Sequence, residues 1–316
     1  MRLSFWKAGS LLALLVSFSA AAQTVRIVVP FAAGGVQDII ARSISNEFGA
    51  KIGRTVIVEN RTGAGGTIGN ASVAKSAPDG TTLLLAAASH TITGHVYAKL
   101  PYHPLRDFTA VAHIGNVDYV LMINGELPVK TVSEFIAHVK ASPGKFNFAS
   151  AGTGSATHLS MAYFSNLAGV EMVHIPFKAT NEAVQEVLVG RAHAVMASTI
   201  GALPFARDAR VKMLGVSGAK RSRFAPELPT IAEAGLRGYE FDSWIGLLGP
   251  AGMPKATLEQ MNGAIADLLK DPAILDRLAK QGVEPSALSP EAFTRLLESD
   301  FARMERVVKA AGARIE

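Results

Sequence analysis

Short apolar runs alternate along the chain with segments whose apolar residues recur every three or four positions. Val25–Val29 is one such run: it carries a single charge and ends at Pro30, which favours a largely buried strand. In Val36–Glu47 the apolar side chains have helical spacing. Because strands and helices continue to alternate in this way, we expect an α/β fold with parallel sheets and βαβ crossovers.

The same patterns place the remaining elements. Apolar runs predict further strands at Thr55–Glu59, Thr82–Ala87, Thr109–Ile114, Asp118–Ile123, Phe146–Ser150, Met172–Pro176, Ala194–Ala197, Val211–Ser217 and Phe241–Leu248. Helical spacing predicts further helices at Thr67–Ala74, Val129–Lys140, Ala156–Ala168, Asn181–Val189, Ile200–Ala209, Lys255–Lys270, Pro272–Gln281 and Pro290–Ala311. Thr131, with Glu134 three residues later, has the pattern of a capping box.

Both halves of the chain have the same βα organisation, and two segments can cross between them, near Tyr119 and near Ser243. We therefore expect two lobes joined by a hinge. Lobe 1 would comprise residues 24–122 and 245–316, and lobe 2 residues 123–244. Ligands of such proteins bind at the lobe interface, and closure is a hinge motion.

The turn after the first strand consists mostly of alanine and glycine. A strand, a tight turn and a helix leave unpaired N–H groups at the helix start, where the positive end of the helix dipole attracts a carboxylate or phosphate. The residues expected to form half of an anion-binding site are Phe31, Ala32, Ala33, Gly34 and Gly35. An ordinary βα connection is the alternative. Asp38 either orders this site or stabilises the positive helix end.

Hydroxyl-bearing residues fill the corresponding turn of the second half. The residues that can donate to an anion there are Ser150, Thr153, Ser155 and Thr157. His158, early in the next helix, either donates to a ligand or packs inside the lobe. The other glycine-rich turn, Asn60–Gly66, either binds an anion in the same way, aided by Arg61, or is a close backbone approach without a ligand, which we favour.

Four further residues near strand ends are candidate ligand contacts, each with a structural alternative. Ser89 and His90 follow the third strand of the first half. Lys178 either neutralises a second carboxylate or is a solvated loop charge. Trp244 either seals the cleft or belongs to the core.

Composition narrows the class of protein. The chain has 316 residues, 49% of them hydrophobic and 18% charged, which suits a folded protein of two domains. Its formal net charge is +5, without the dense basic stripe of a nucleic-acid binder. No set of His, Asp and Glu has metal-ligand spacing, so we expect neither a metal nor a cofactor.

Residues 1–22 have the pattern of a secretory signal peptide. Arg2 and Lys7 precede a short apolar centre, and Ala20–Ala22 offers a small-residue cleavage site. The chain has no cysteine, which excludes disulfides and a lipid-modified cysteine at the cleavage site. We expect a soluble monomer in the bacterial periplasm.

A periplasmic hydrolase is the main alternative to a binding protein. Ser155 and His158 are three residues apart and can share one helix face. The Gly-x-Ser-x-Gly pattern is absent, and neither a third group to orient the histidine nor a carboxylate pair is evident. Binding needs only amides and hydroxyls, so we expect a binding protein and not an enzyme.

Several stretches, taken in order, resemble the Bug-type, tricarboxylate-transporter-like family of periplasmic substrate-binding proteins. They include VVPFAAGGVQDIIAR, VIVENRTGAGGTIGNASVAKSAPDGTTLL, PGKFNFASAGTGSATHLS and WIGLLGPAGMPKATLEQMN, and the resemblance runs from about Val25 to the C-terminus. It implies a two-lobed venus-flytrap fold. It also implies capture of a small, usually carboxylated solute for a tripartite transporter of the inner membrane. Presentation of the bound solute to a sensor kinase is an alternative.

The resemblance also implies which residues bind. In that family the first glycine turn, here Phe31–Gly35 with Asp38, commonly holds the carboxylate of the ligand. The other lobe would contribute Ser150, Thr153, Ser155, Thr157, His158, Lys178 and the strand end Ser198–Thr199.

The chain departs from the family pattern in two places. Ala32-Ala33 stands where a proline-glycine pair is common, and Ser198-Thr199 where an Asp-Asn pair is common. Because an ammonium group would lack an acidic partner at the second place, we expect a plain carboxylate, aliphatic or aromatic, and not an amino acid.

Overall fold

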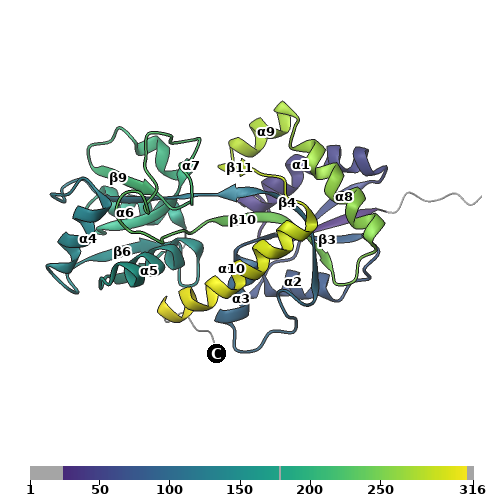
Figure 1. Cartoon of the computed structure of the whole chain (residues 1–316), viewed down its shortest axis with the longest axis horizontal. Coiled ribbons are helices and arrows are strands. Elements are labelled where there is room, and N and C mark those ends of the chain that lie inside the picture. Colours follow the sequence, from purple (N-terminus) through teal and green to yellow (C-terminus); the bar gives the residue numbers. More distant parts are fainter. Residues whose placement is uncertain (1–23, 178, 312–316) are drawn as a thin grey trace, which may run out of the picture.

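The chain folds into two lobes that lie side by side and are joined by crossing strands (Figure 1). The computed structural model describes residues 24–177 and 179–311. The predicted signal peptide and Lys178 lie outside these residues. The expectation of an α/β fold with two lobes is confirmed.

Lobe 1 is built on a six-stranded sheet in the order β11-β4-β10-β3-β1-β2. Its strands are β1 (Val25–Val29), β2 (Val56–Asn60), β3 (Thr82–Ala87), β4 (Phe108–Val117), β10 (Ser243–Pro250) and β11 (Val283–Pro285). Its helices are α1 (Val36–Ile52), η1 (Ala64–Gly66), α2 (Thr67–Ala74), α3 (Ser89–Val96), α8 (Lys255–Leu268), α9 (Pro272–Ala279) and α10 (Pro290–Ala311).

Lobe 2 is built on a five-stranded sheet in the order β7-β6-β8-β5-β9. Its strands are β5 (Tyr119–Asn124), β6 (Asn147–Ser150), β7 (Val173–Pro176), β8 (Ala194–Ser198) and β9 (Val211–Val216). Its helices are α4 (Val132–Lys140), α5 (Ala156–Ala168), α6 (Thr180–Leu188), α7 (Thr199–Ala202) and η2 (Leu203–Phe205).

Both sheets are mixed, so the expected parallel pairing holds for only part of each sheet. β1 pairs in parallel with β2 and β3, and β6 with β7 and β8. The strands that carry the chain between lobes, β4, β5 and β10, form antiparallel pairs, as does β11. A strand that enters a lobe from the other lobe runs against the βα units already there, so both sheets are mixed.

The two lobes meet where β4 is followed by β5 and where β10 begins. Asp118 is the single residue between β4 and β5. β5 belongs to the second sheet, so this crossing lies a few residues before the predicted division at 122/123. On the return, β10 joins the first sheet at Ser243, next to the predicted division at 244/245.

Local sequence explains most element ends. Thr131 caps α4 by accepting a hydrogen bond from the Glu134 N–H, as the capping pattern predicts. α1 ends at Gly53, whose φ of 67° suits glycine. The region Ser89–Thr91, expected as a strand-end turn, forms the first turn of α3, and the short strand β11 was not predicted.

Helix α10 spans both lobes (Figure 1). It contacts α3 and β4 of lobe 1 and α5 of lobe 2. Met304, Val307 and Val308 near its C-terminal end are buried in the same apolar cluster as Phe135 and Phe164 of lobe 2. The last helix therefore does not simply cover lobe 1, because it completes the core of lobe 2 as well.

A buried carboxylate fixes α10 against lobe 1. Asp300 is 1% exposed and accepts hydrogen bonds from Thr91 Oγ1 at 2.6 Å, Trp244 Nε1 at 2.9 Å and Arg303 Nη2 at 2.6 Å. Arg303 also donates to the carbonyl of Glu240, in the segment that returns from lobe 2. One side chain thus joins α3, β10 and α10.

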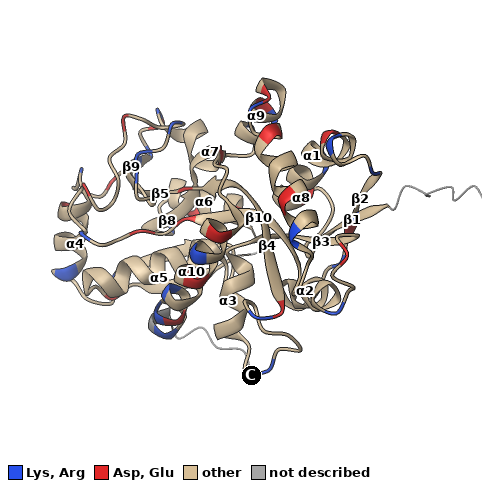
Figure 2. Ribbon diagram, turned by 45° about the vertical axis from the view of Figure 1, so that its right-hand side comes forward, with Lys and Arg blue, Asp and Glu red and all other residues tan. Residues whose placement is uncertain are grey.

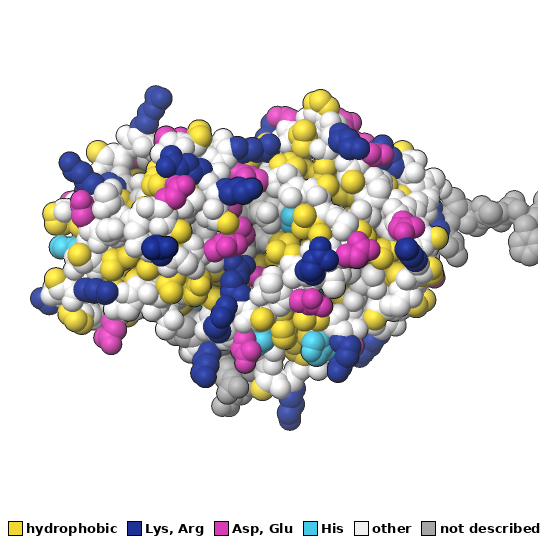
Figure 3. Space-filling model, viewed as in Figure 1, with side chains coloured by type: hydrophobic (Ala, Val, Ile, Leu, Met, Phe, Trp, Pro, Cys, Tyr) yellow, Lys and Arg dark blue, Asp and Glu magenta, His cyan; other side chains and the backbone are white. Residues whose placement is uncertain are grey.

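None of the helices in residues 24–177 and 179–311 is both long and apolar enough to cross a membrane. Lysines and arginines are interspersed with acidic residues over both lobes (Figure 2). The face in Figure 3 shows no continuous basic stripe. This distribution agrees with the low net charge.

We predict that Asp300→Ala lowers the free energy of unfolding by about 3 kcal/mol or more, because three buried donors lose their acceptor together. Chemical denaturation measures this change. Asp267→Ala is the matched control: this aspartate pairs with Lys270 on the surface, and its loss should leave the denaturation midpoint in place. Equal midpoints for the two variants would contradict the role of Asp300.

Candidate functional site

The strands of lobe 1 that precede the glycine turns end on the side that faces lobe 2. β10 enters from lobe 2 at Ser243, and Ile245 near its start pairs with Ala87 at the end of β3. β1 runs parallel to β3. The turn Phe31–Gly35 after β1 therefore lies at the lobe junction.

The same holds for lobe 2. β5 enters from lobe 1 at Tyr119, which pairs with Ser198 at the end of β8. β6 runs parallel to β8, so the turn that follows Ser150 also lies at the junction. The two predicted turns thus occupy the ends of their sheets that face the other lobe.

The first turn presents its main chain to solvent. Ala32, Ala33 and Gly34 are exposed, and Gly34 has a φ of 79°, which favours glycine. The N–H groups of Ala32 and Ala33 have no hydrogen-bond partner in the part of the chain that the structure describes. No side chain caps α1, since Gly35 is at its N-cap. Unpaired N–H groups at the positive end of a helix are suited to an anion.

Asp38 holds this turn in place from behind. It is 3% exposed, and its carboxylate accepts hydrogen bonds from the Gly34 N–H at 2.9 Å, from Arg42 Nε at 3.0 Å and from Asn60 Nδ2 at 2.9 Å. Asn60 also donates to the carbonyl of Phe31 at 3.0 Å. Chiefly through the Arg42 hydrogen bond, the pKa of Asp38 falls to about 2. Asp38 is therefore an ionised positioning residue whose oxygens already have protein donors.

Sequence reasoning missed the two partners of Asp38. Arg42 lies one helical turn after Asp38, a spacing at which opposite charges meet. Asn60 ends β2, the strand next to β1, so its position at the same sheet edge was a usable signal.

The second turn is shaped by its own hydroxyl groups. Thr157 Oγ1 accepts from the Ala151 N–H at 2.9 Å and lies 3.0 Å from Ser155 Oγ. Ser155 caps α5 by accepting from the His158 N–H at 3.2 Å. Thr153, at the tip of this turn, is exposed. Gly152 and Gly154 adopt φ values of 108° and 79°.

A stacked pair of histidines supports this turn. The ring centroids of His158 and of His174 on β7 are 3.9 Å apart. Nδ1 of His158 accepts a hydrogen bond from the Gly154 N–H at 3.1 Å. His174 Nε2 contacts Ser150 Oγ at 2.6 Å. Burial, followed by the nearby His174, lowers the pKa of His158 to about 4, so the imidazole that accepts from Gly154 is neutral at pH 7. Sequence reasoning missed His174, although β7 pairs with β6 directly.

Other sequence candidates are not brought to the turns. His90 is 2% exposed, bonds to the Pro104 carbonyl at 2.8 Å and packs against Tyr102 and Phe108. Trp244 is 1% exposed and donates to Asp300. Both side chains therefore lie in the core, the structural alternative for each.

The remaining candidates lie at the junction side of their sheets but differ in access. Thr199 is 1% exposed, and its hydroxyl donates to the Asp118 carbonyl at 3.1 Å. Ser89 is half-buried at the start of α3. Lys178 lies outside the described residues.

The serine–histidine pairs lack the geometry of a nucleophile and its base. Ser155 Oγ meets the backbone N–H of His158, while the ring Nδ1 accepts from Gly154. Ser150 Oγ does contact an imidazole, but Ser150 is 0% exposed and out of reach of a substrate. Within residues 24–177 and 179–311, no group of three or more His, Asp or Glu side chains could hold a metal ion.

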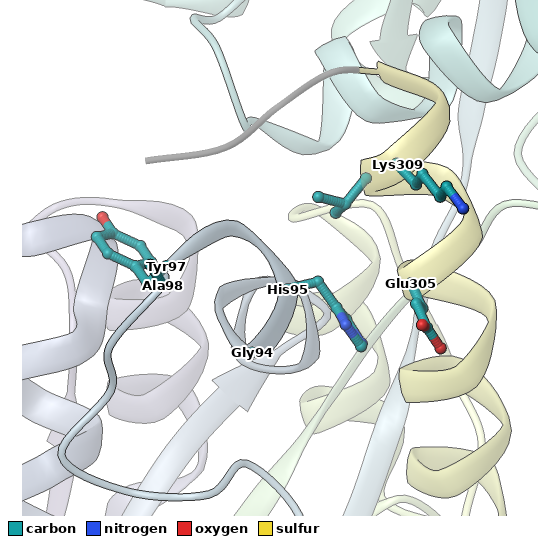
Figure 4. A pocket seen from close by; sticks show the side chains of 7 residues that line it. Gly94, His95, Tyr97, Ala98, Glu305 and Lys309 are labelled. Atoms are coloured by element: carbon teal, nitrogen blue, oxygen red, sulfur yellow. The ribbon is translucent and has the colours of Figure 1, made fainter. Parts of the chain in front are cut away.

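A cavity of about 640 Å³ lies between α3 and the C-terminal half of α10 (Figure 4). His95 points towards α10 and bonds to the Phe301 carbonyl, whereas Tyr97 points away from that helix. Because the His95 ring in this cavity is already bonded to a main-chain carbonyl, the exposed main chain of the two junction turns is the better candidate site.

Comparison with known proteins identifies the family. Residues 40–313 match the family model described as "Tripartite tricarboxylate transporter family receptor". The chain is 34% identical to a UPF0065 protein from the tcbD-tcbE intergenic region of Pseudomonas sp. (strain P51), over 89% of this chain and 84% of the relative. It is 31% identical to protein BugT of Bordetella pertussis, over 93% of this chain and 91% of BugT.

Solved structures agree. A protein of R. palustris with adipate superposes with a TM-score of 0.77 and 32% identity, over 93% of this chain and 98% of that one. MatC of Rhodopseudomonas palustris with bound malate superposes with a TM-score of 0.72 and 33% identity, over 90% of this chain and 98% of MatC. A TctC solute-binding protein from Polaromonas superposes with a TM-score of 0.82 and 25% identity, over 92% of this chain and 99% of that one.

The sequence resemblance is thus confirmed, and the chain belongs to the tripartite tricarboxylate transporter receptor family, the TctC and Bug type of periplasmic solute-binding proteins.

Proposed function

We propose that this protein captures a small carboxylate between its lobes in the periplasm and delivers it to a tripartite transporter of the inner membrane. The observation that carries the proposal is the arrangement of the two turns. Each lobe directs a helix N-terminus, preceded by a glycine turn, towards the other lobe. Main-chain N–H groups at such positions recognise anions.

The proposed ligand contacts are the unpaired main-chain N–H groups of Ala32 and Ala33 in lobe 1, and Thr153, Ser155 and Thr157 in lobe 2. Asp38 and His158 position these turns through the Gly34 and Gly154 N–H groups. Because both lobes offer donors, a ligand with a carboxylate at each end suits the site best. The related structures with adipate and malate support this ligand class.

An amino acid fits less well. β8 ends in Ser198, whose hydroxyl accepts from the Gly201 N–H, and in Thr199, whose hydroxyl donates to the Asp118 carbonyl. Among the described residues, Ser198 and Thr199 give this strand end hydroxyl groups in place of the acidic side chain that an ammonium group would pair with. Main-chain and hydroxyl donors can bind an acid without changing it chemically. We therefore propose a binding protein and not an enzyme.

The same proposal covers the parts that surround the site. The signal pattern of residues 1–22 supports export to the periplasm, and the two crossing segments, at Asp118 and just before Ser243, support a hinge between the lobes. We propose that the protein acts as a monomer. A sensor kinase is the alternative recipient, and ligand-dependent capture of transporter subunits by the purified protein would distinguish the two.

We expect a thermal-shift screen to find dicarboxylates such as adipate and malate among the strongest stabilisers, ahead of monocarboxylates such as benzoate. A ligand that binds only the folded protein stabilises it by about 2.7 kcal/mol at one hundred times its Kd, which raises the unfolding midpoint. Stabilisation by a sugar or an amino acid, with no carboxylate active, would refute the proposed ligand class.

In lobe 1, Asp38→Ala should weaken carboxylate binding about tenfold to hundredfold, since the Gly34 N–H and Arg42 lose a partner worth about 1–3 kcal/mol. Isothermal titration calorimetry measures the affinity. The matched control is Asp276→Ala on the exposed face of α9, which should bind as the parent protein does. If Asp38→Ala also binds normally, the first turn is not part of the site.

In lobe 2, Ser155→Ala combined with Thr157→Ala should cost roughly 1–3 kcal/mol of binding free energy, because the ligand loses two proposed hydroxyl contacts and the turn loses the acceptors of the Ala151 and His158 N–H groups. Thr294→Ala combined with Ser299→Ala removes the same groups from the exposed side of α10 and serves as the control. Unchanged affinity in the first double variant would remove the second turn from the site.

A further inference from the structure

Each of the two segments that cross between the lobes carries one aspartate, and the two side chains meet. Val117 at the end of β4 pairs with Ser243 at the start of β10. Continued by one residue, this antiparallel register places Asp118 opposite Asp242. Residues directly opposite each other on antiparallel strands have neighbouring side chains.

The side-chain geometry agrees with the register. A single point, the position that a Cβ of Gly218 would occupy, lies 2.8 Å from Asp118 Oδ1 and 3.0 Å from Asp242 Oδ1. The two oxygens are therefore no more than about 6 Å apart, so the two carboxyl groups lie side by side. Asp118 is 6% exposed.

A hydrogen bond between these two neighbouring carboxyl groups requires a proton. An ionised carboxylate only accepts hydrogen bonds, so two of them cannot bond to each other, whereas a protonated carboxyl group donates. Oδ1 of Asp242 is buried, and no N–H or O–H donor of the described residues reaches it. One proton on the pair satisfies both groups, and its loss leaves two like charges side by side.

Most of the charged groups around the pair favour its protonated form. Glu284 of β11 adds negative charge and is itself bonded to Ser222 and to the Arg223 N–H. Glu240 adds a further negative charge near Asp242, whereas Arg303 of α10 opposes it. Tyr119 lies beside both aspartates, and its own pKa is raised by burial, so it stays neutral.

Burial above all, then the charges of Asp242 and Glu284, raises the pKa of Asp118 to about 8. The pKa of Asp242 is also raised, again mainly by burial. The folded arrangement therefore binds a proton that a separated or unfolded aspartate, with its ordinary pKa near 4, releases at neutral pH.

We propose that the Asp118–Asp242 pair is a proton-dependent contact that stabilises the present arrangement of the lobes and is lost when both carboxyl groups ionise. Rotation of one lobe on the other changes the backbone of the two crossing segments, so the separation of these side chains depends on the lobe angle. The contact is complete at mildly acid pH and is lost as the pH rises through about 8. This proposal goes beyond carboxylate capture and does not depend on the identity of the ligand.

The experiment uses the signal-free full chain without ligand. Because the sequence has no cysteine, Lys140→Cys on α4 and Gln260→Cys on α8 provide one spin-label site in each lobe. The distance distribution between the labels is measured at pH 6 and pH 9.5. We expect a second population at pH 9.5 that amounts to at least three times its share at pH 6.

Asp118→Asn and, separately, Asp242→Asn keep a hydrogen-bonding pair that needs no extra proton, so both should retain the pH 6 distribution at pH 9.5. Asp276→Asn on exposed α9 is the matched control and should respond to pH as the parent does. An identical distribution at both pH values in the parent, or a full response in either variant of the pair, would overturn the proposal. Neither outcome bears on carboxylate binding, which the thermal-shift screen tests.

Discussion

The antiparallel pairing of the crossing strands with the βα strands of each lobe is the constraint on which the rest of the structure depends. β10 runs against β3, and β5 runs against β8. Since both crossing strands start at the junction, the strands opposite to them must end there. Topology alone therefore directs the turns of both lobes, and the helices after them, to one place.

Those turns are held in shape by side chains that do not themselves face the junction. Asp38 bonds to the Gly34 N–H in lobe 1, and His158 bonds to the Gly154 N–H in lobe 2. In each case a residue four positions after a glycine fixes that glycine's N–H, and a neighbouring strand supplies a second partner, Asn60 or His174. The two lobes thus hold similar turns with different acceptors, an ionised carboxylate in lobe 1 and a neutral imidazole in lobe 2.

Sequence patterns predicted the α/β class, the two-lobed plan and most elements, because apolar periodicity reports directly on burial. They could not predict the antiparallel pairs, since strand direction depends on where the chain re-enters a lobe. Strand ends were a good guide to the two turns but a poor guide to single side chains. His90 and Trp244 both lie near strand ends, but their polar atoms bond to residues of other segments, Pro104 at 14 positions and Asp300 at 56 positions along the chain. Only the folded structure shows that such groups are already satisfied inside the core.

The position of α10 has a consequence for how the lobes can be separated. Met304, Val307 and Val308 fill the core of lobe 2, although the helix starts in lobe 1 and is bonded to it through Asp300. A fragment consisting of residues 119–242 would lack these apolar side chains and expose the surface they cover. The two halves are consequently not interchangeable modules, and a chimaera that exchanged one lobe between relatives would have to carry the matching C-terminal helix with it.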